Sequence, residues 1–136
     1  MMAYDTVSAR LSGEAYRVAL SDGRHDWAGD VGRESGGADA GPDPHAQLLA
    51  ALGSCTAITV KMYAARKGWP LDDVRVALAY AADHRDGDSK ISRQVELVGA
   101  LDAAQRARLL DVANACPLHK LLTGSIAVAT TLTENT

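Results

Sequence analysis

A long stretch without charged side chains lies near the middle of the chain. Residues 46–60 contain no Asp, Glu, Lys or Arg. Large apolar side chains recur through this stretch and just beyond it, at Leu48, Leu49, Leu52, Ile58, Val60 and Met62. A surface helix keeps one polar face, so a helix that is apolar on every side has to be covered. A membrane span takes about 20 consecutive apolar residues, more than we count here. Residues 45–67 are therefore predicted to form a central buried helix.

Both ends of this helix carry local sequence signals. Asp43 has a carboxylate that can cap the first turn, and Pro44 suits the first helical position because it has no N–H to leave unpaired. Gly68 follows the last turn, where a residue in the left-handed region commonly ends a helix. The preceding segment, residues 31–44, is rich in Gly, Asp and Pro, and we predict that it is a loop.

The remaining sequence indicates short strands and further helices. Alternation of polar and apolar residues predicts strands at residues 3–11 (with Tyr4 and Thr6), 16–20, 25–30, 73–83, 91–97 and 126–132. One face of the strand at 91–97 consists of Ile91, Arg93, Val95 and Leu97. Helices are predicted at 103–115, capped by Asp102, and at 117–122. Blocks of strands alternate with helices without regular βαβ units, which favours an α+β fold in a single domain over residues 1–136.

Composition narrows the classes of function. The 136 residues include 14 Lys and Arg against 17 Asp and Glu, and the net charge is −3. The basic side chains are scattered, so we expect no nucleic-acid partner. A secretory signal has a basic segment followed by an apolar segment, and the sequence from residues 1–5 onward does not show this pattern. We therefore expect neither a secretory signal nor a membrane partner. The expected location is the cytoplasm, where thiols are kept reduced.

The two cysteines lie at different kinds of position. Cys55 is midway along the predicted central helix, where the small residues Gly53 and Ser54 would let a ligand or another backbone approach. Cys116 lies where a helix breaks, immediately before Pro117. As the N-cap of the following turn, its thiolate would be stabilised by free N–H groups and the helix dipole. Either cysteine could instead be a small buried hydrophobic residue without a chemical role.

Histidines and arginines near the cysteines leave alternatives open. A formal set of zinc ligands consists of Cys55, Cys116, His45 and His119. The sequence contains no CxxC or HxxxH pair, and structural histidines are the simpler interpretation. On one continuous helix, His45 and Cys55 would be about 15 Å apart, too far to share a metal. Arg24 and Arg33 flank the loop before the helix, and either both are solvated or one of them lowers the pKa of Cys55.

Two segments resemble the cysteine motifs of the OsmC/Ohr family. Residues 41–57 are Gly-Pro-Asp-Pro-His-Ala-Gln-Leu-Leu-Ala-Ala-Leu-Gly-Ser-Cys-Thr-Ala, similar to the sequence around the family's first cysteine. Residues 115–120 are Ala-Cys-Pro-Leu-His-Lys, similar to the second-cysteine motif. The resemblance extends over nearly the whole chain. It implies an intertwined homodimer, in which two central helices pack back to back and sheets with strands from both subunits wrap around them.

The resemblance also implies a reaction, the detoxification of hydroperoxides in a stress response. Cys55 would attack the O–O bond of an organic hydroperoxide, and Cys116 would close a disulfide on the resulting sulfenic acid. An external dithiol, either a lipoyl protein or a thioredoxin-like protein, would reduce this disulfide, and no bound cofactor or metal is implied. The family's activating arginine corresponds in place to Arg33, with Arg24 and Arg17 as alternatives.

One position departs from the family pattern. His45 stands where the OsmC and Ohr members have a glutamate that holds the arginine. A histidine supplies no fixed negative charge, although a neutral imidazole can accept a hydrogen bond from an arginine. A second hypothesis is therefore a catalytically weak protein of the same fold that binds a small molecule or regulates redox state. A third hypothesis is a metal-binding module built on the cysteines and His119.

Overall fold

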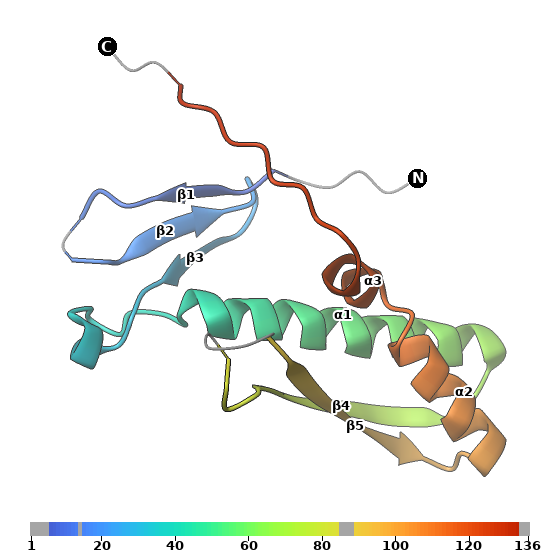
Figure 1. The fold of residues 1–136 in the computed structure, drawn as a ribbon. Helices are drawn as coiled ribbons and strands as arrows, with labels where there is room; N and C mark the ends of the chain where they lie inside the picture. The colour runs from blue at the N-terminus through green and yellow to red at the C-terminus, as the bar shows by residue number, and fades with distance from the viewer. Residues whose placement is uncertain (1–5, 14, 85–88, 134–136) are drawn as a thin grey trace. The chain divides into compact units, whose positions relative to one another are not determined.

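The computed structural model describes residues 6–13, 15–84 and 89–133 of the chain. Within these residues, three strands, one long helix, two longer strands and two shorter helices follow one another along the chain (Figure 1). This content confirms the predicted α+β class. The chain divides into two compact units, residues 1–50 and residues 51–136. The single domain over residues 1–136 stays a prediction.

The first unit contains a three-stranded antiparallel sheet in the order β1-β2-β3. Its strands are β1 (Ser8–Arg10), β2 (Val18–Ser21) and β3 (Asp26–Gly29). Leu20 on the central strand lies opposite Ala9 on one side and Trp27 on the other. Strands are therefore present at all three predicted places, but each is shorter than predicted. Tyr4, at the start of the first predicted strand, lies outside the described residues.

The loop that follows β3 is organised by one carboxylate. Asp30 is buried, and its side chain accepts hydrogen bonds from the backbone N–H groups of Val31, Ala38 and Ala40 at 2.7, 3.3 and 3.1 Å. These bonds, with that of Ala40 foremost, hold the pKa of Asp30 below its ordinary value of 3.8. A short 3-10 turn, η1 (Arg33–Ser35), lies within this loop.

The long helix α1 (Pro44–Lys67) begins and ends as its sequence predicts. The Asp43 carboxylate accepts a hydrogen bond from the N–H of Ala46 at 2.7 Å, which caps the first turn. At the other end, Gly68 has a φ of 69°, in the left-handed region. The N–H groups of Gly68 and Trp69 donate to the carbonyls of Ala65 and Ala64, so the last turn closes as a Schellman motif.

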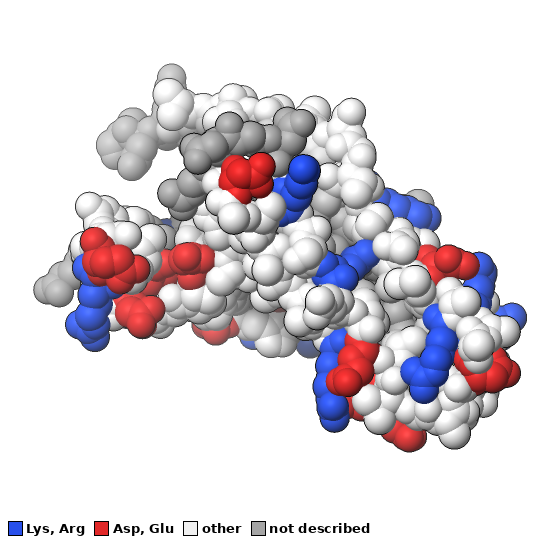
Figure 2. All heavy atoms as spheres, turned by 60° about the horizontal axis from the view of Figure 1, so that its bottom comes forward, with Lys and Arg blue, Asp and Glu red and all other residues white. Residues whose placement is uncertain are grey.

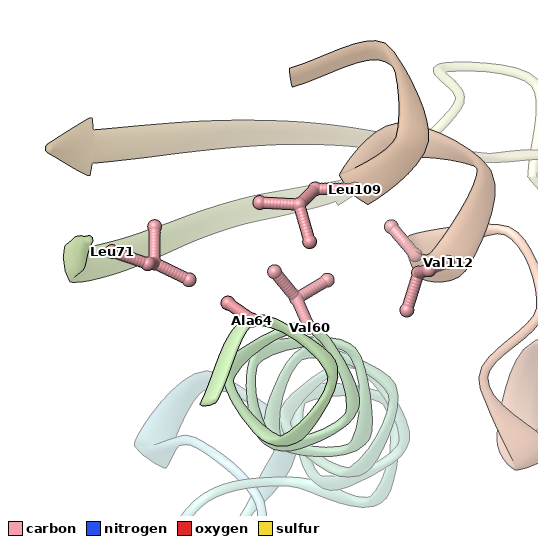
Figure 3. Packing of buried hydrophobic residues seen from close by; sticks show 6 residues of the cluster. Val60, Ala64, Leu71, Leu109 and Val112 are labelled. Atoms are coloured by element: carbon pink, nitrogen blue, oxygen red, sulfur yellow. The ribbon is translucent and has the colours of Figure 1, made fainter. Parts of the chain in front are cut away.

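The core of the second unit lies between α1, a strand hairpin and α2 (Ala103–Ala113). The hairpin consists of β4 (Leu71–Tyr80) and β5 (Ile91–Gly99), paired antiparallel with Val76 opposite Val95. The buried cluster consists of Val60, Ala64, Leu71, Leu109, Val112 and Ala113. Figure 3 shows side chains from α1, from the start of β4 and from α2 pointing toward one another. The predicted strands at 73–83 and 91–97 are thus confirmed as this hairpin.

Only one side of α1 is covered within the chain. The buried positions recur every four residues, at Leu52, Thr56, Val60 and Ala64. Ile58 and Met62, elsewhere on the helix, are 52% and 55% exposed. The predicted burial of this helix is therefore confirmed on one side, and the rest of its surface is not covered within a single chain. The physical reason is that one hairpin and one short helix cover a face of a cylinder and cannot enclose it.

The length of α1 also corrects a sequence expectation. The helix has 24 residues, and its most apolar 18-residue window has a mean hydropathy of 1.4, which is long and apolar enough to cross a membrane by length and composition. The expectation that this stretch is too short for a span is wrong on these criteria. The core helix of a water-soluble protein meets the same criteria, and Val60 and Ala64 pack against β4 and α2 as in such a core.

The helices near the C-terminus are those predicted from the sequence. At the start of α2, the Asp102 carboxylate accepts the N–H of Gln105 at 2.8 Å, and the Gln105 side-chain oxygen accepts the N–H of Asp102 at 2.9 Å. These two bonds form a capping box. The next helix, α3 (Pro117–Thr123), begins directly after Cys116. The break predicted at Cys116 is thus confirmed.

The strand predicted at residues 126–132 is not formed. Within the part of the chain that the structure describes, residues 125–133 have no regular secondary structure and no strand pairs with them. Val128 and Leu132 are 84% and 99% exposed. Alternation makes a segment suitable for a sheet, but a strand exists only where a neighbouring strand pairs with its backbone N–H and C=O groups.

Charged side chains of both signs are mixed on the face of the molecule that Figure 2 shows. On the face shown in Figure 2, Lys and Arg lie among Asp and Glu, and neither sign forms an extended patch. On the hairpin, for example, Arg75 donates hydrogen bonds to Asp73 and Glu96 at 2.8 and 3.0 Å. This mixing agrees with a sequence of net charge −3 whose basic residues are scattered.

Candidate active site

The break between α2 and α3 places the first of two thiols. Cys116 is the N-cap residue of α3, with extended φ and ψ of −64° and 149°, and Pro117 takes the first helical position. Cys116 Sγ accepts a hydrogen bond from the N–H of His119 at 3.3 Å. The side chain is fully buried. A buried sulfur with a backbone N–H directed at it is a favourable place for negative charge.

The second thiol comes from α1. Cys55 lies next to the buried residue Thr56 on this helix and is itself half-buried. The Cys55 thiol is close enough to Cys116 to help lower the pKa of that thiol, although the two residues are far apart in sequence. Both cysteines are free thiols. Because Cys55 is half-buried and Cys116 is fully buried, solvent reaches Cys55 and not Cys116.

Thr56 connects these thiols to the helix backbone. Its hydroxyl donates to the carbonyl of Leu52 at 2.7 Å and accepts from Arg93 Nη1 at 2.9 Å. The same oxygen lies 3.8 Å from Cys116 Sγ. A threonine hydroxyl has one hydrogen to donate, so its proton can turn either to Leu52 or to Cys116.

Arg93 projects from β5 and contacts four groups of the site. Nη1 lies 2.9 Å from Thr56 Oγ1 and 4.0 Å from Cys116 Sγ. Nη2 lies 3.0 Å from Asn114 Oδ1 and 2.8 Å from His119 Nδ1. Because a guanidinium only donates hydrogen bonds, His119 Nδ1 must accept, so the imidazole is neutral with its proton on Nε2.

These contacts set the acidity of the site. Burial by itself raises the pKa of the Cys116 thiol. The His119 N–H, the Thr56 hydroxyl and the Cys55 thiol, with the charge of Arg93 added, outweigh burial, and the pKa of Cys116 lies below its ordinary value of 9.0. Burial, and then the charge of Arg93, lower the pKa of His119 below its ordinary value of 6.5. Both shifts favour a thiolate beside a neutral imidazole.

A cavity of about 380 Å³ opens beside this cluster. Its lining combines polar and apolar side chains, namely Leu52, Ser89, Ile91, Arg93, Asn114, His119, Leu122 and Thr123. A space of this size and mixed character suits a small organic molecule with a polar reacting end.

The other residues singled out in the sequence belong to the first unit. Arg33 lies in η1, and His45 is the second residue of α1; both are exposed. Arg24, in the turn between β2 and β3, and Arg17, just before β2, are exposed as well. Roles for these residues at Cys55 stay predictions. Among the described residues, no three His, Cys, Asp or Glu side chains are grouped as metal ligands.

Sequence reasoning missed three members of the cluster, namely Arg93, Thr56 and Asn114. One signal for Arg93 was present, because this arginine falls on the otherwise apolar face of the alternating strand 91–97. A charged side chain on an inward face is rare unless it has partners. No local pattern marks Thr56 or Asn114, since each joins the site only through contacts with residues distant in sequence.

Known proteins share the family and the fold of this chain. The family described as OsmC-like protein matches residues 36–131. The OsmC-like protein from Mycoplasma pneumoniae has a TM-score of 0.75 at 19% identity, over 91% of this chain and 90% of its own. The organic hydroperoxide resistance protein OsmC from Legionella pneumophila has a TM-score of 0.66 at 20% identity, over 90% and 93%. OhrB, the organic hydroperoxide resistance protein of Bacillus subtilis, has a TM-score of 0.61 at 22% identity, over 90% and 92%. No curated protein matches the chain.

Proposed function

The chain belongs to the OsmC-like protein family, and on that premise we propose that it is a thiol peroxidase that reduces organic hydroperoxides to alcohols. Two of the structures that share its fold are named organic hydroperoxide resistance proteins. The observation that carries the proposal is the thiol pair, in which a half-buried Cys55 lies close to a fully buried Cys116 and helps to lower its pKa.

The proposed reaction has two steps in the protein. First, the Cys55 sulfur attacks one oxygen of the hydroperoxide, so an S–O bond forms, the O–O bond breaks, and the other oxygen leaves as the alcohol with the thiol proton. Cys55 then carries a sulfenic acid. Second, the Cys116 sulfur attacks the Cys55 sulfur, the S–O bond breaks, and water leaves. Because Cys116 already touches Cys55, this step is intramolecular and needs no search for a partner.

An external dithiol completes the cycle by reducing the disulfide to two thiols, and the protein itself needs no bound cofactor. We propose a lipoyl protein or a thioredoxin-like protein as this reductant. We further propose that Arg33, or in its place Arg24 or Arg17, polarises the Cys55 thiolate, with His45 as a neutral acceptor for that arginine. A cytoplasmic location, where such reductants are available, is part of the same proposal.

A homodimer is the proposed form of the protein. Ile58 and Met62 on α1 leave apolar surface open to solvent, and residues 125–133 have the alternation of a strand without a described partner. A second copy of the chain could cover the exposed side of α1 and provide a strand that pairs with residues 125–133. Contiguous exposed apolar surface on a helix is typical of such interfaces.

The experiment counts free thiols per chain after one equivalent of cumene hydroperoxide is added to the reduced protein, with Cys55→Ser and Cys116→Ser in parallel. We expect the wild type to lose both thiols within seconds. Sulfenic acid should be trapped in Cys116→Ser and not in Cys55→Ser, because only Cys55 is accessible to the peroxide. Thiols that react no faster than an ordinary cysteine would contradict the peroxidase.

That negative result would favour a second candidate function. His45 stands at the family's glutamate position, so this chain lacks one fixed charge of the family's site. A protein of this kind would keep the fold and the cavity beside Arg93 and would bind a small molecule or report redox state with little turnover. Ligand-induced changes in melting temperature, measured with the reduced protein, would then identify the ligand class.

A further inference from the structure

Hydrogen-bond donors surround one sulfur of the pair. Cys116 Sγ accepts the N–H of His119 at 3.3 Å and lies 4.0 Å from Arg93 Nη1 and 3.8 Å from the Thr56 hydroxyl. The thiol of Cys55 is its fourth neighbour. A protonated thiol is a weak acceptor, whereas a thiolate accepts several hydrogen bonds. The donors therefore match the deprotonated form of Cys116.

The charge balance around Arg93 leads to the same conclusion. Its guanidinium is half-buried, and its hydrogen-bond partners Thr56, Asn114 and His119 are all neutral. Among the described residues, no carboxylate lies within ion-pair distance of Arg93. A partly buried cation without a counter-charge is costly. Among the residues that the structure describes, the one group in contact with Arg93 that can become an anion is Cys116.

We propose that Arg93 is a positioning residue that holds Cys116 as a thiolate in the reduced protein, aimed at the sulfur of Cys55 and ready to close the disulfide. The role of Arg93 in closing the disulfide rests on the proposed peroxidase function. The pairing of Arg93 with the Cys116 thiolate does not depend on peroxide, and it can be tested without it.

The orientation of Arg93 is set by its other partners. Nη2 is held by Asn114 Oδ1 and His119 Nδ1, which leaves Nη1 directed at Thr56 and Cys116. A planar guanidinium can satisfy these groups together because its donors form a rigid fork. A lysine ammonium at the same place would keep the charge but could not reach both sides. The site is thus built for arginine.

The step is balanced without any further reagent. The Cys116 thiolate supplies the electron pair of the new S–S bond, and the S–O bond of the Cys55 sulfenic acid breaks. Hydroxide leaves and takes a proton from solvent, so the net product is water. The Cys55 sulfur is reduced by this attack while Cys116 is oxidised. Arg93 transfers no proton and acts only through its position and charge.

The first arm of the test measures the pKa of Cys116 alone, by thiolate absorbance against pH in Cys55→Ser. In this background the serine hydroxyl can replace the Cys55 thiol as a donor to Cys116, so the pKa should still lie below the ordinary value of 9.0. Adding Arg93→Met or Arg93→Gln should raise it, and Arg93→Lys should restore part of the difference. Arg75→Met, which removes an exposed arginine on the neighbouring strand, is the matched control and should leave the pKa unchanged.

The second arm follows the lifetime of the Cys55 sulfenic acid after a pulse of cumene hydroperoxide, with Cys55 intact. At pH values below the Cys116 pKa of both proteins, each unit by which Arg93→Met raises this pKa lowers the thiolate fraction about tenfold. The greater nucleophilicity of a more basic thiol returns about threefold per unit, so closure should be slower by about threefold per unit of pKa. At alkaline pH the variant should equal or exceed the wild type. A purely structural role for Arg93 would slow closure at every pH.

Several results would overturn the proposal. One is a Cys116 pKa at or above 9.0 in Cys55→Ser, which needs no Arg93 variant. Another is an unchanged pKa in a folded Arg93→Met or Arg93→Gln protein, as judged by circular dichroism. A sulfenic acid trapped on Cys116 rather than on Cys55 would reverse the roles of the two thiols. If the Arg93 variants raise the pKa of Cys116 but the protein consumes no peroxide, the pairing of Arg93 with the Cys116 thiolate is supported and the proposed peroxidase function is contradicted.

Discussion

Cys55 and Cys116 carry the same thiol group in different surroundings. Cys55 is half-buried on a helix, and Cys116 is fully buried at a helix N-terminus. Exposure decides which sulfur a hydroperoxide can reach, whereas donors decide which sulfur holds negative charge. Accessibility belongs to Cys55 and stabilised negative charge to Cys116. The proposed reaction can therefore be divided between them: the peroxide oxidises the accessible Cys55, and the buried Cys116 then attacks the oxidised sulfur.

His119 makes the site sensitive to pH, and this sensitivity should appear in stability. Its folded pKa lies below 6.5, so the unfolded chain binds more protons than the folded chain in this range. The stability contribution is complete above pH 6.5 and is lost as pH falls through the folded pKa. We expect the urea midpoint of the wild type to fall more between pH 7.5 and 5.5 than that of His119→Gln. Equal losses in the two proteins would contradict this assignment.

At the scale of elements, α2 is held to α1 by the apolar cluster in Figure 3. Leu109 is fully buried in this cluster, and the next residue on the helix, Leu110, is 55% exposed. The position of α2 matters for the site because its C-terminal end carries Asn114 and leads directly to Cys116. Packing at Leu109 therefore supports the geometry at the thiols.

Leu109→Ala should destabilise the protein by about 3 kcal/mol, since it removes buried methyl groups and leaves a cavity that relaxes only in part. Leu110→Ala is the matched control, and its free energy of unfolding should change far less because the side chain already contacts water. Urea denaturation at one fixed protein concentration measures both. Similar losses for the two variants would contradict the observed orientation of α2.

The loop after β3 offers a second test at this scale. The pKa of Asp30 is lowered by the N–H groups of Ala40 and Val31, so its contribution to stability is present above pH 3.8 and is lost as pH falls through the folded pKa. Asp30→Asn should lower the melting temperature at pH 7, and the difference from the wild type should shrink at pH 3 and below. A constant difference across this range would show that the charge of Asp30 is unimportant.

At the scale of the whole molecule, one chain leaves its long helix half covered. Ile58 and Met62 are more than half exposed, and so are Val128 and Leu132 beyond α3. Removing such surface from water is worth about 25 cal/mol per Å², which is the driving force for the proposed homodimer. The same helix is long and apolar enough to cross a membrane by length and composition. A homodimer would cover its exposed apolar side chains with protein instead of lipid, so measuring the oligomeric state distinguishes the two interpretations of this helix.

Ile58→Glu and Met62→Glu should each weaken the proposed homodimer, because a carboxylate would be buried at the interface without a partner. Arg66→Glu introduces the same side chain at an exposed charged position of α1 and is the matched control. Light scattering after size-exclusion chromatography at micromolar concentration measures the mass. A wild type of 14.3 kDa under these conditions would rule out the homodimer.

Local chemistry was enough to predict most elements of this protein from its sequence. Asp43 and Pro44 begin α1, Gly68 ends it, and the break at Cys116 follows from Pro117, because caps and prolines act on neighbouring backbone groups. The paired cysteine motifs identified the family. Strand ends were less exact, since pairing with a neighbour decides where a strand stops.

Tertiary structure decided what depends on contacts between distant segments. Arg93 joins Thr56, Asn114, His119 and Cys116 only because β5, α1 and the α2–α3 break meet, and no local pattern encodes that meeting. The same reason explains why the strand predicted at residues 126–132 is not formed and why part of α1 is exposed in a single chain. A helix face is buried only where another surface packs against it, and an alternating segment becomes a strand only where another strand pairs with it. In the described structure of one chain, no surface covers Ile58 and Met62 of α1 fully and no strand pairs with residues 125–133.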